Sequence, residues 1–257
     1  MIIDILTIFP EMFTGILNSS IIKRTIDKGL VVINIHDFRE YTKNKHKKVD
    51  DTIYGGGAGM LVMCQPVVDC LKSIPYYDKA YKIITSAQGT HYTQNKAKEL
   101  SQKEHIIIIC GHYEGIDHRV LNYVDEEISI GDYILTGGEV ASLAIIDSII
   151  RLIPNAITHS SIEDESFVTG LLEYPQYTKP VTYDGYDVPA VLVNGNHEEI
   201  RKYRKFESLK NTYLNRPDLL DIYEKDELDT LYIEEIKKGI MEYEKVKDLK
   251  IKKKKNV

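Results

Sequence analysis

The run Ile106-Ile-Ile-Ile-Cys110 most constrains the fold, because every residue in it is apolar. Such a run is typical of a strand covered by helices on both faces, as in a parallel sheet. Similar runs predict four more strands, at Ile2–Ile8, Val31–His36, Lys82–Thr85 and Glu127–Ile130, and intervening stretches predict helices at Asn95–Leu100 and Glu139–Ile153. This alternation predicts an α/β fold with a mainly parallel sheet, in which ligands bind to loops that follow strands.

The second half of the chain has a different character. The stretch Asn155–Pro189 is rich in Ser, Thr, Tyr, Gly and Pro, and predicts a long irregular connection. Asn196 is placed to cap a helix that begins at His197. Apolar residues at helical spacing predict an amphipathic helix near the end, through Ile233, Ile236, Ile240 and Tyr243. We therefore expect a second, smaller helical domain.

The composition excludes several classes of protein. With 43% apolar and 28% charged residues in a chain of 257, the protein is expected to be globular and cytoplasmic. The apolar start is short and contains Asp4, so it predicts a buried strand and not a signal peptide. The three cysteines are widely spaced and the histidines scattered, so neither a disulfide framework nor a metal site is expected.

The net charge of −6 does not favour a nucleic-acid partner, but phosphates respond to local charge. Three basic clusters are candidates for such contacts. They are Arg39, Lys43, Lys45, His46, Lys47 and Lys48; Arg201, Lys202, Arg204, Lys205 and Lys210; and the tail Lys250–Lys255. Any one of them alone is more typical of a solvated face.

Four segments have more glycine and polar residues than a simple turn requires. The glycine-rich segment Tyr54-Gly-Gly-Gly-Ala-Gly-Met60 matches neither a dinucleotide-binding fingerprint nor a phosphate-binding loop, which disfavours a dehydrogenase and a nucleotide hydrolase. The other three follow predicted strands: Thr85–Gly89, Gly111–Gly115 and Ile130–Glu139. Because glycine allows close backbone approach, these loops could surround a flat ligand; sharp turns are the simpler explanation.

The order of these segments resembles one family, the bacterial tRNA (guanine-N(1)-)-methyltransferases of the TrmD type. The resemblance spans nearly the whole chain and is specific because the motifs occur in the family's order. They are Asp50-Asp51 before Tyr54–Met60, Cys110–Asp117, Ile130–Glu139, Arg151-Leu-Ile-Pro154, Gly170–Thr178 and Gly195-Asn-His197.

The resemblance implies a SPOUT methyltransferase fold with a deep trefoil knot, which the general rule against knotted chains would not predict. It also implies a homodimer, S-adenosyl-L-methionine as cofactor, and methylation of N(1) of guanosine at tRNA position 37. It leaves a magnesium requirement open. The expected domains are residues 1–158 for the cofactor, a linker over 159–175, and a helical tRNA-binding domain over 176–257.

Matching positions supply the expected cofactor site. They are Thr85, Ser86, Ala87, Gln88, Gly111, Tyr113, Glu114, Gly115, Ile130, Gly131, Asp132, Tyr133, Ile134, Leu135, Gly137 and Gly138. Ala87 stands where the family often has proline.

The chemistry requires a general base, because N(1) of guanine carries a proton until it reacts. In the family, an aspartate before Ser-Phe is that base, and an arginine stabilises the charge that develops on the 6-oxo group. Arg151 matches the arginine. Glu165 precedes Ser166-Phe167 and is the expected base, with Asp164 as its rival.

Two other functions stay open at the level of the sequence. A SPOUT methyltransferase could act on ribose or on ribosomal RNA, and ribose methylation requires no base directed at a ring proton. A non-enzymatic RNA-binding protein could have a degenerate cofactor pocket, although the intact glycine loops argue against it.

Overall fold

The computed structural model describes residues 1–157 and 165–249. The chain divides into two compact units, residues 1–158 and 159–257. No helix among the described residues has the length and apolar character needed to cross a membrane.

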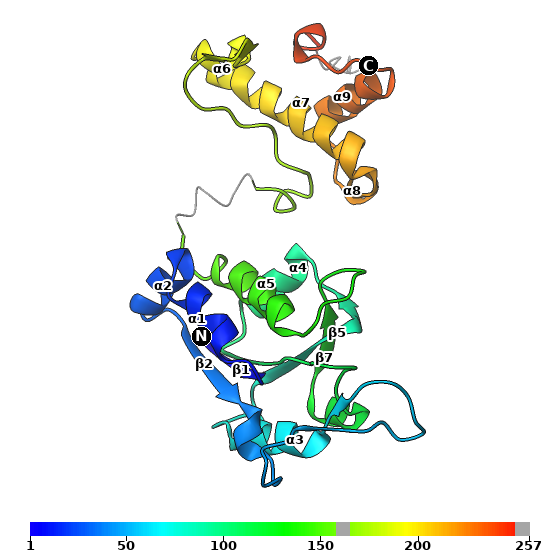
Figure 1. Cartoon of the computed structure of the whole chain (residues 1–257). Helices are drawn as coiled ribbons and strands as arrows, with labels where there is room; N and C mark the ends of the chain where they lie inside the picture. The colour runs from blue at the N-terminus through cyan, green and yellow to red at the C-terminus, as the bar shows by residue number, and fades with distance from the viewer. Residues whose placement is uncertain (158–164, 250–257) are drawn as a thin grey trace, which may run out of the picture. The chain divides into compact units, whose positions relative to one another are not determined.

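The first unit has a central sheet of five parallel strands in the order β2-β1-β6-β5-β7 (Figure 1). The strands are β1 (Ile2–Thr7), β2 (Val32–Asp37), β5 (Tyr81–His91), β6 (His105–Ile109) and β7 (Glu126–Ser129). All five expected strands are present, and the predicted α/β class with a parallel sheet is confirmed. The apolar run 106–110 forms β6, a central strand between β1 and β5.

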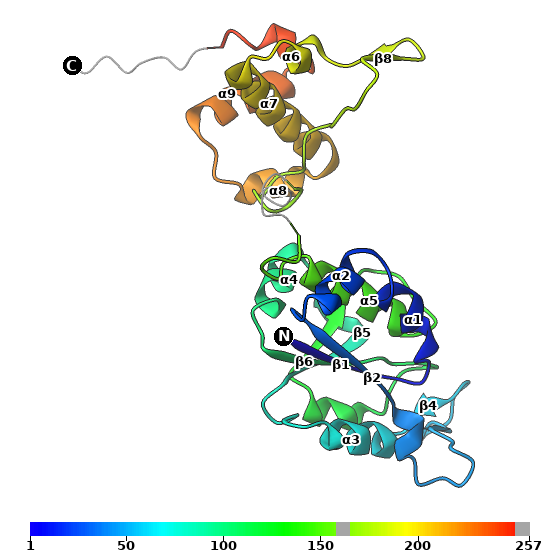
Figure 2. The same cartoon turned by 90° about the vertical axis from the view of Figure 1, so that its left-hand side faces the viewer.

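Helices cover both faces of this sheet, which explains why the central run 106–110 is apolar without interruption (Figure 2). One face packs against α1 (Glu11–Leu17), α2 (Ser20–Asp27), α4 (Gln94–Leu100) and α5 (Glu139–Ile150). The other packs against α3 (Cys64–Ser73) and the 3-10 helices η1 (Phe38–Tyr41) and η2 (His118–Tyr123). In β6, Ile106 and Ile108 face the first group, whereas Ile107 and Ile109 face the second.

Two boundaries in this unit differ from the sequence prediction. The strand expected over Lys82–Thr85 continues to His91, because β5 pairs with β7 again after a bulge of four residues at 86–89. The helix expected over Glu139–Ile153 ends at Ile150, and turns follow it.

Two short strands, β3 (Asp50–Asp51) and β4 (Leu61–Val62), pair on either side of the glycine-rich segment 54–60.

The three cysteines are free thiols. Cys70 and Cys110 are buried in the cores on opposite faces of the sheet. Burial, together with nearby carboxylates, raises the pKa of Cys70 to about 12. Both residues therefore act as small apolar core residues.

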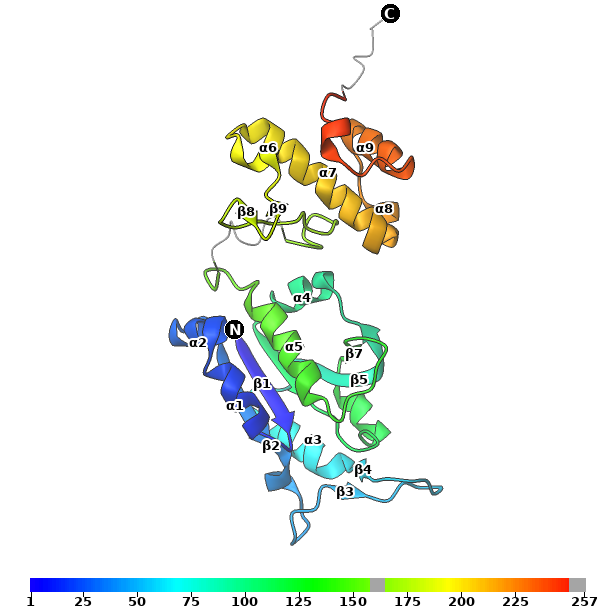
Figure 3. The same cartoon turned by 45° about the horizontal axis from the view of Figure 1, so that its top comes forward.

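The second unit is built around α7 (His197–Asn215), which packs against α6 (Ala190–Val193), α8 (Pro217–Ile222) and α9 (Glu227–Lys237) (Figure 3). Phe206 of α7 and Tyr232 of α9 meet edge to face, with ring centroids 5.4 Å apart. Asn196 caps α7 as predicted, because its side chain accepts a hydrogen bond from the backbone N–H of Glu199. Within the described part of 155–189, the only regular structure is the hairpin of β8 (Thr182–Tyr183) and β9 (Tyr186–Asp187).

The predicted amphipathic helix through Tyr243 is partly wrong. Helix α9 ends at Lys237, and Gly239 then takes a φ of +90°, a left-handed conformation that ends a helix. Tyr243 lies in the 3-10 helix η4 (Tyr243–Lys245), yet it packs into the same core as Ile236. The apolar spacing thus identified residues that share a core, although they do not share one helix.

A buried carboxylate joins three strands of the first sheet. The carboxylate of Asp4 in β1 lies 2.6 Å from His36 Nε2 of β2 and 2.6 Å from His105 Nε2 of β6, and it accepts a hydrogen bond from Asn34 Nδ2 at 3.0 Å. Burial raises the pKa of Asp4, but hydrogen bonds with His36, Asn34 and His105 outweigh it, so the pKa falls below its ordinary value.

We predict that Asp4→Asn lowers the free energy of unfolding by about 1–3 kcal/mol at pH 7, because buried hydrogen bonds to a charge are lost. A carboxyl with a lowered pKa in the folded state stabilises the protein above its unfolded pKa, and this stabilisation disappears as the pH falls through the folded pKa. The difference between the variants should therefore shrink in acid. Urea denaturation across pH measures it.

The matched control is Asp27→Asn, which removes an exposed carboxylate paired with Lys23 at 2.9 Å. We expect it to cost less than about 0.5 kcal/mol. Equal losses for the two variants would contradict a special role for Asp4.

Candidate functional site

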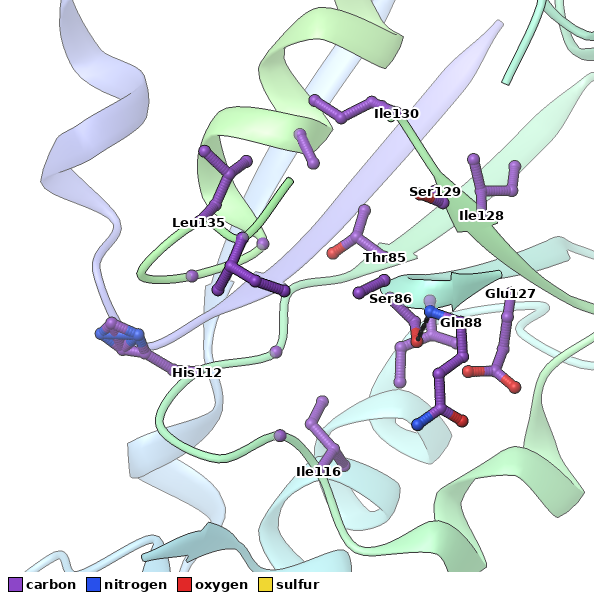
Figure 4. Close-up of a pocket in the computed structure, with 18 of the residues that line it drawn as sticks. Thr85, Ser86, Gln88, His112, Ile116, Glu127, Ile128, Ser129, Ile130 and Leu135 are labelled. Atoms are coloured by element: carbon purple, nitrogen blue, oxygen red, sulfur yellow. Dashed lines mark hydrogen bonds between the residues drawn. The ribbon is translucent and has the colours of Figure 1, made fainter. Parts of the chain in front are cut away.

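Three loops meet at the carboxyl ends of neighbouring strands and enclose a cavity of about 420 Å³. They are the bulge of β5 at 86–89, the loop after β6 at 110–117, and the loop from β7 to α5 at 130–138. Figure 4 shows Thr85 and Ser86 at the end of the first half of β5, Ile128 and Ser129 on β7, and Leu135 on the loop before α5. This is the edge at which parallel sheets bind ligands.

All of the predicted cofactor-binding residues except Asp132 line this cavity: Thr85, Ser86, Ala87, Gln88, Gly111, Tyr113, Glu114, Gly115, Ile130, Gly131, Tyr133, Ile134, Leu135, Gly137 and Gly138. Asp132 lies on the same loop and is exposed, but its side chain does not line the cavity. That these residues bind a cofactor stays a prediction.

Sequence reasoning did not assign the remaining lining residues, some of which lie within the three loops and some beside them: Ile84, His112, Ile116, Asp117, His118, Leu121, Glu127, Ile128, Ser129, Thr136 and Ala141. Glu127 to Ser129 are part of β7, which was treated only as a strand. They line the cavity together with the bulge of β5, which interrupts the ladder between Thr85 and Thr90, both of which pair with Ile128. Ile128 and Ser129 are nevertheless buried.

The loop before α5 lies directly on the end of β6. The backbone N–H of Gly138 donates to the carbonyl of Gly111 at 2.7 Å, and His112 Nδ1 lies 2.7 Å from the carbonyl oxygen of Thr136. A Cβ at position 138 would lie 2.1 Å from Thr85 Oγ1 and 2.9 Å from the backbone nitrogen of Gly111. Only glycine therefore lets the two loops come this close.

A chain of hydrogen bonds also links the start of α5, directly after the loop 130–138, to the end of β1. Glu139, the first residue of α5, accepts a hydrogen bond from Thr7 Oγ1 at 2.8 Å, and both residues are fully buried. The Thr7 hydroxyl in turn accepts from the backbone N–H of Phe9 at 2.9 Å. The ring of Phe9 meets His112 edge to face, with centroids 4.9 Å apart. The end of β1 thus positions both loops.

The cavity has a negative lining. Its described lining residues include the carboxylates of Glu114, Asp117 and Glu127, but no lysine or arginine. Arg119 Nε donates a hydrogen bond to Asp117 Oδ1 at 2.9 Å. This side-chain hydrogen bond lowers the pKa of Asp117 below its ordinary value, although partial burial acts in the opposite direction. Such a lining favours a ligand with positive charge and disfavours a polyphosphate. This supports the exclusion of a nucleotide hydrolase.

The predicted catalytic residues lie in different units. Arg151 follows α5 in the first unit, where its backbone N–H donates to the carbonyl of Asp147 at 3.3 Å. Glu165 lies in the second unit, where its carbonyl accepts from the N–H of Val168 at 3.2 Å. Asp164 lies outside the described residues. Within the described ranges, there is no group of three or more His, Cys, Asp or Glu residues that could hold a metal ion.

Comparisons with known proteins agree with the resemblance. Residues 1–222 match the family described as tRNA (Guanine-1)-methyltransferase TrmD. The chain is 52% identical over 239 residues to a tRNA (guanine-N(1)-)-methyltransferase of Clostridium botulinum (strain Langeland), which covers 93% of this chain and 99% of that protein. Proteins of the same name are 54% identical over 218 residues in Clostridium novyi (84% and 90% covered) and 51% identical over 224 residues in Geobacillus kaustophilus (86% and 92% covered).

We predict that Gly138→Ala lowers the free energy of unfolding by about 1–3 kcal/mol, because the new methyl group overlaps Thr85 and the backbone at position 111. The backbone at 138 has a φ of −78°, which any residue can adopt, so the effect isolates the lack of space. Urea denaturation of the full-length variant measures it.

The control is Gly15→Ala in α1, where nothing lies within 4 Å of the added Cβ. This change should leave the protein as stable or more stable by about 0.5–1 kcal/mol. A Gly138→Ala variant as stable as the wild type would show that the close contact between the loops is not needed.

Proposed function

The chain belongs to the tRNA (guanine-1)-methyltransferase family TrmD, and from this premise we propose that it transfers a methyl group from S-adenosyl-L-methionine to N(1) of guanosine at position 37 of tRNA. The observation that carries the proposal is the family match over residues 1–222, which includes the three loops around the cavity. The reaction takes place in the cytoplasm, where tRNA matures.

The cavity has the properties that S-adenosyl-L-methionine requires. This cofactor supplies an electrophilic methyl group on a positively charged sulfonium sulfur, and it also carries an ammonium group. Glu114 and Glu127 line the cavity and can stabilise positive charge, while backbone groups of 86–89 and 130–138 can bind the adenine. The ring of Tyr133 adds an exposed aromatic surface on the same loop.

We place the trefoil knot of the family in the same three loops. The approach of Gly138 to Gly111 and Thr85 supports it, because the chain returns after β7 to lie against two earlier loops. A Cβ at Gly89 of β5 would lie 2.5 Å from the backbone of Glu127 in β7, so these two strands are also in close contact. Such packing is what a threaded arrangement requires.

The functional unit is a homodimer in this proposal. Large apolar side chains are exposed on one chain at Met12 and Ile16 of α1, at Val140 of α5, and at Tyr133 and Ile134 of the cavity loop. Burial of such a surface between two chains would be favourable, since exposed apolar patches are typical of interfaces. The loop 130–138 would then be held by both chains.

The chemistry assigns roles to the catalytic residues. The carboxylate of Glu165, or of Asp164 in its place, removes the proton from N(1) of the guanine, which leaves a lone pair able to attack the methyl group. As this proton leaves, negative charge develops on the 6-oxo group, and the guanidinium of Arg151 stabilises it. When N(1) attacks, the bond between the methyl carbon and the sulfonium sulfur breaks, and S-adenosyl-L-homocysteine leaves as a neutral thioether.

Contacts with tRNA phosphates involve a subset of the basic residues. On α7, Lys202 pairs with Glu198 at 2.7 Å, Lys205 with Asp229 at 3.3 Å, and Lys210 with Glu207. Their charges are thus balanced within the second unit, and Arg201 and Arg204 are the better candidates. In the first unit, Lys45 and Lys48 are exposed and have no ion pair among the residues that the structure describes. The tail 250–257 lies outside the described residues.

We predict that labelled methyl from S-adenosyl-L-methionine appears on a tRNA with guanosine at position 37 and not on one with adenosine there. The reason is that only guanine has an N(1) proton for the base to remove, next to a 6-oxo group. Equal labelling of both would indicate a methyltransferase with another RNA target, and labelling of neither would indicate an RNA-binding protein.

We predict that Glu165→Gln lowers the methylation rate by about 10²–10⁴-fold, because the amide cannot accept the proton. The paired variant Asp164→Asn should retain most activity. Single-turnover rates with saturating tRNA measure the two, and cofactor affinity should be unchanged in both. If Asp164→Asn loses activity and Glu165→Gln keeps it, the assignment of the base is reversed.

A further inference from the structure

The second unit contains a cavity of about 550 Å³ that the proposed methyl transfer does not use. We name it the α7 cavity. Its lining comes from the irregular segment 174–181, Val188 after the β8–β9 hairpin, helix α6, and Ile200 and Arg204 on α7. All of these residues belong to one unit, so the cavity is complete within the second unit.

The charge of this cavity is opposite to that of the first. Its described lining residues include two cations, Lys179 and Arg204, and no aspartate or glutamate. Arg204 also differs from its lysine neighbours on α7, because it has no carboxylate partner among the described residues. Its guanidinium lies instead over the ring of Tyr174, 4.8 Å from the centroid. An arginine held this way keeps its outer hydrogen-bond donors available.

The described lining of this cavity also includes two aromatic side chains, Tyr174 and Tyr177. Tyr177 lines the cavity and is 48% exposed. Val181 and Val188 join across the base of the hairpin through an N–H to carbonyl hydrogen bond of 2.8 Å. Beyond them, Tyr183 and Tyr186 face each other in the hairpin and are 75% and 80% exposed. Figure 2 shows this hairpin extending from the helices of the unit.

We propose that the α7 cavity binds one unpaired nucleotide of the tRNA. This proposal rests on the proposed function, which makes tRNA the partner. The combination of a planar cation and exposed tyrosines is suited to a phosphate and an unstacked base at once. A base within a duplex could not enter a concave site, so the nucleotide comes from a loop or an extruded position. Tyr177 stacks on the base, and Arg204 with Lys179 binds the adjacent phosphate.

The test compares tRNA binding of Arg204→Gln and Tyr177→Ala with that of Lys202→Gln. Lys202 lies on the same helix, outside the cavity, and removing it changes the net charge by the same amount. We expect both cavity variants to bind tRNA about tenfold or more weakly, and the control to stay within about twofold. Arg204→Gln should also reduce the slope of log Kd against log salt by about one.

A photo-crosslink identifies the occupant directly. Replacement of Tyr177 by p-benzoylphenylalanine should give a crosslink to tRNA at an unpaired nucleotide. A crosslink only to a second copy of the chain would overturn the proposal and make the cavity part of a subunit interface. Cavity variants that bind tRNA as well as the control would also overturn it.

Failure of this proposal can be told from failure of the proposed function. If the wild type methylates guanosine 37 but Arg204→Gln binds tRNA normally, only the α7 cavity is wrongly assigned. If the variant with p-benzoylphenylalanine at position 177 gives the predicted crosslink, but the wild type does not discriminate position 37, only the reaction is wrongly assigned. Binding of S-adenosyl-L-methionine should be equal in all variants, since the first cavity lies in the other unit.

Discussion

The contact between Gly138 and the end of β6 is the constraint on which the first unit depends. One hydrogen bond of 2.7 Å, from Gly138 to Gly111, holds the loop after β7 against the loop after β6. Residues of both loops line the cavity, together with residues of β5. Helix α5 begins at the next residue, so the same contact also sets where this helix starts on the sheet. The buried pair Thr7 and Glu139 adds a second attachment at that point.

The two cavities differ in charge, and this difference fits the two substrates of the proposed reaction. The described lining of the first cavity has carboxylates and no lysine or arginine, whereas that of the second has two cations and no carboxylate. A sulfonium ligand and a polyanion would therefore each be attracted to one site and repelled from the other. A net charge of −6 for the whole chain conceals this separation.

Much of the fold was predictable because the local signals agreed with the tertiary environment. The run 106–110, most of which forms β6, is buried on both faces of the sheet, so its residues are apolar without interruption. The cap at Asn196 could be predicted because it depends on a hydrogen bond with Glu199, only three residues away in the sequence. The end of α9 at Lys237 was missed because the apolar spacing continues past it into η4, where tertiary packing and not helix geometry uses those residues. For the site, motifs indicated the three loops, but Glu127 and Ser129 became visible only through the bulge in β5, which depends on pairing with β7.

The bulge in β5 has a consequence for the entropy of ligand binding. The residues 86–89 leave the ladder and return to it, so both ends of this short loop are anchored to β7. A loop attached at one end must be ordered when the ligand arrives, and that ordering weakens binding. In this chain the ordering would occur during folding, so that the proposed cofactor would meet a surface already shaped for it. Strand pairing thus provides the rigidity that proline would give at position 87, where this chain has alanine.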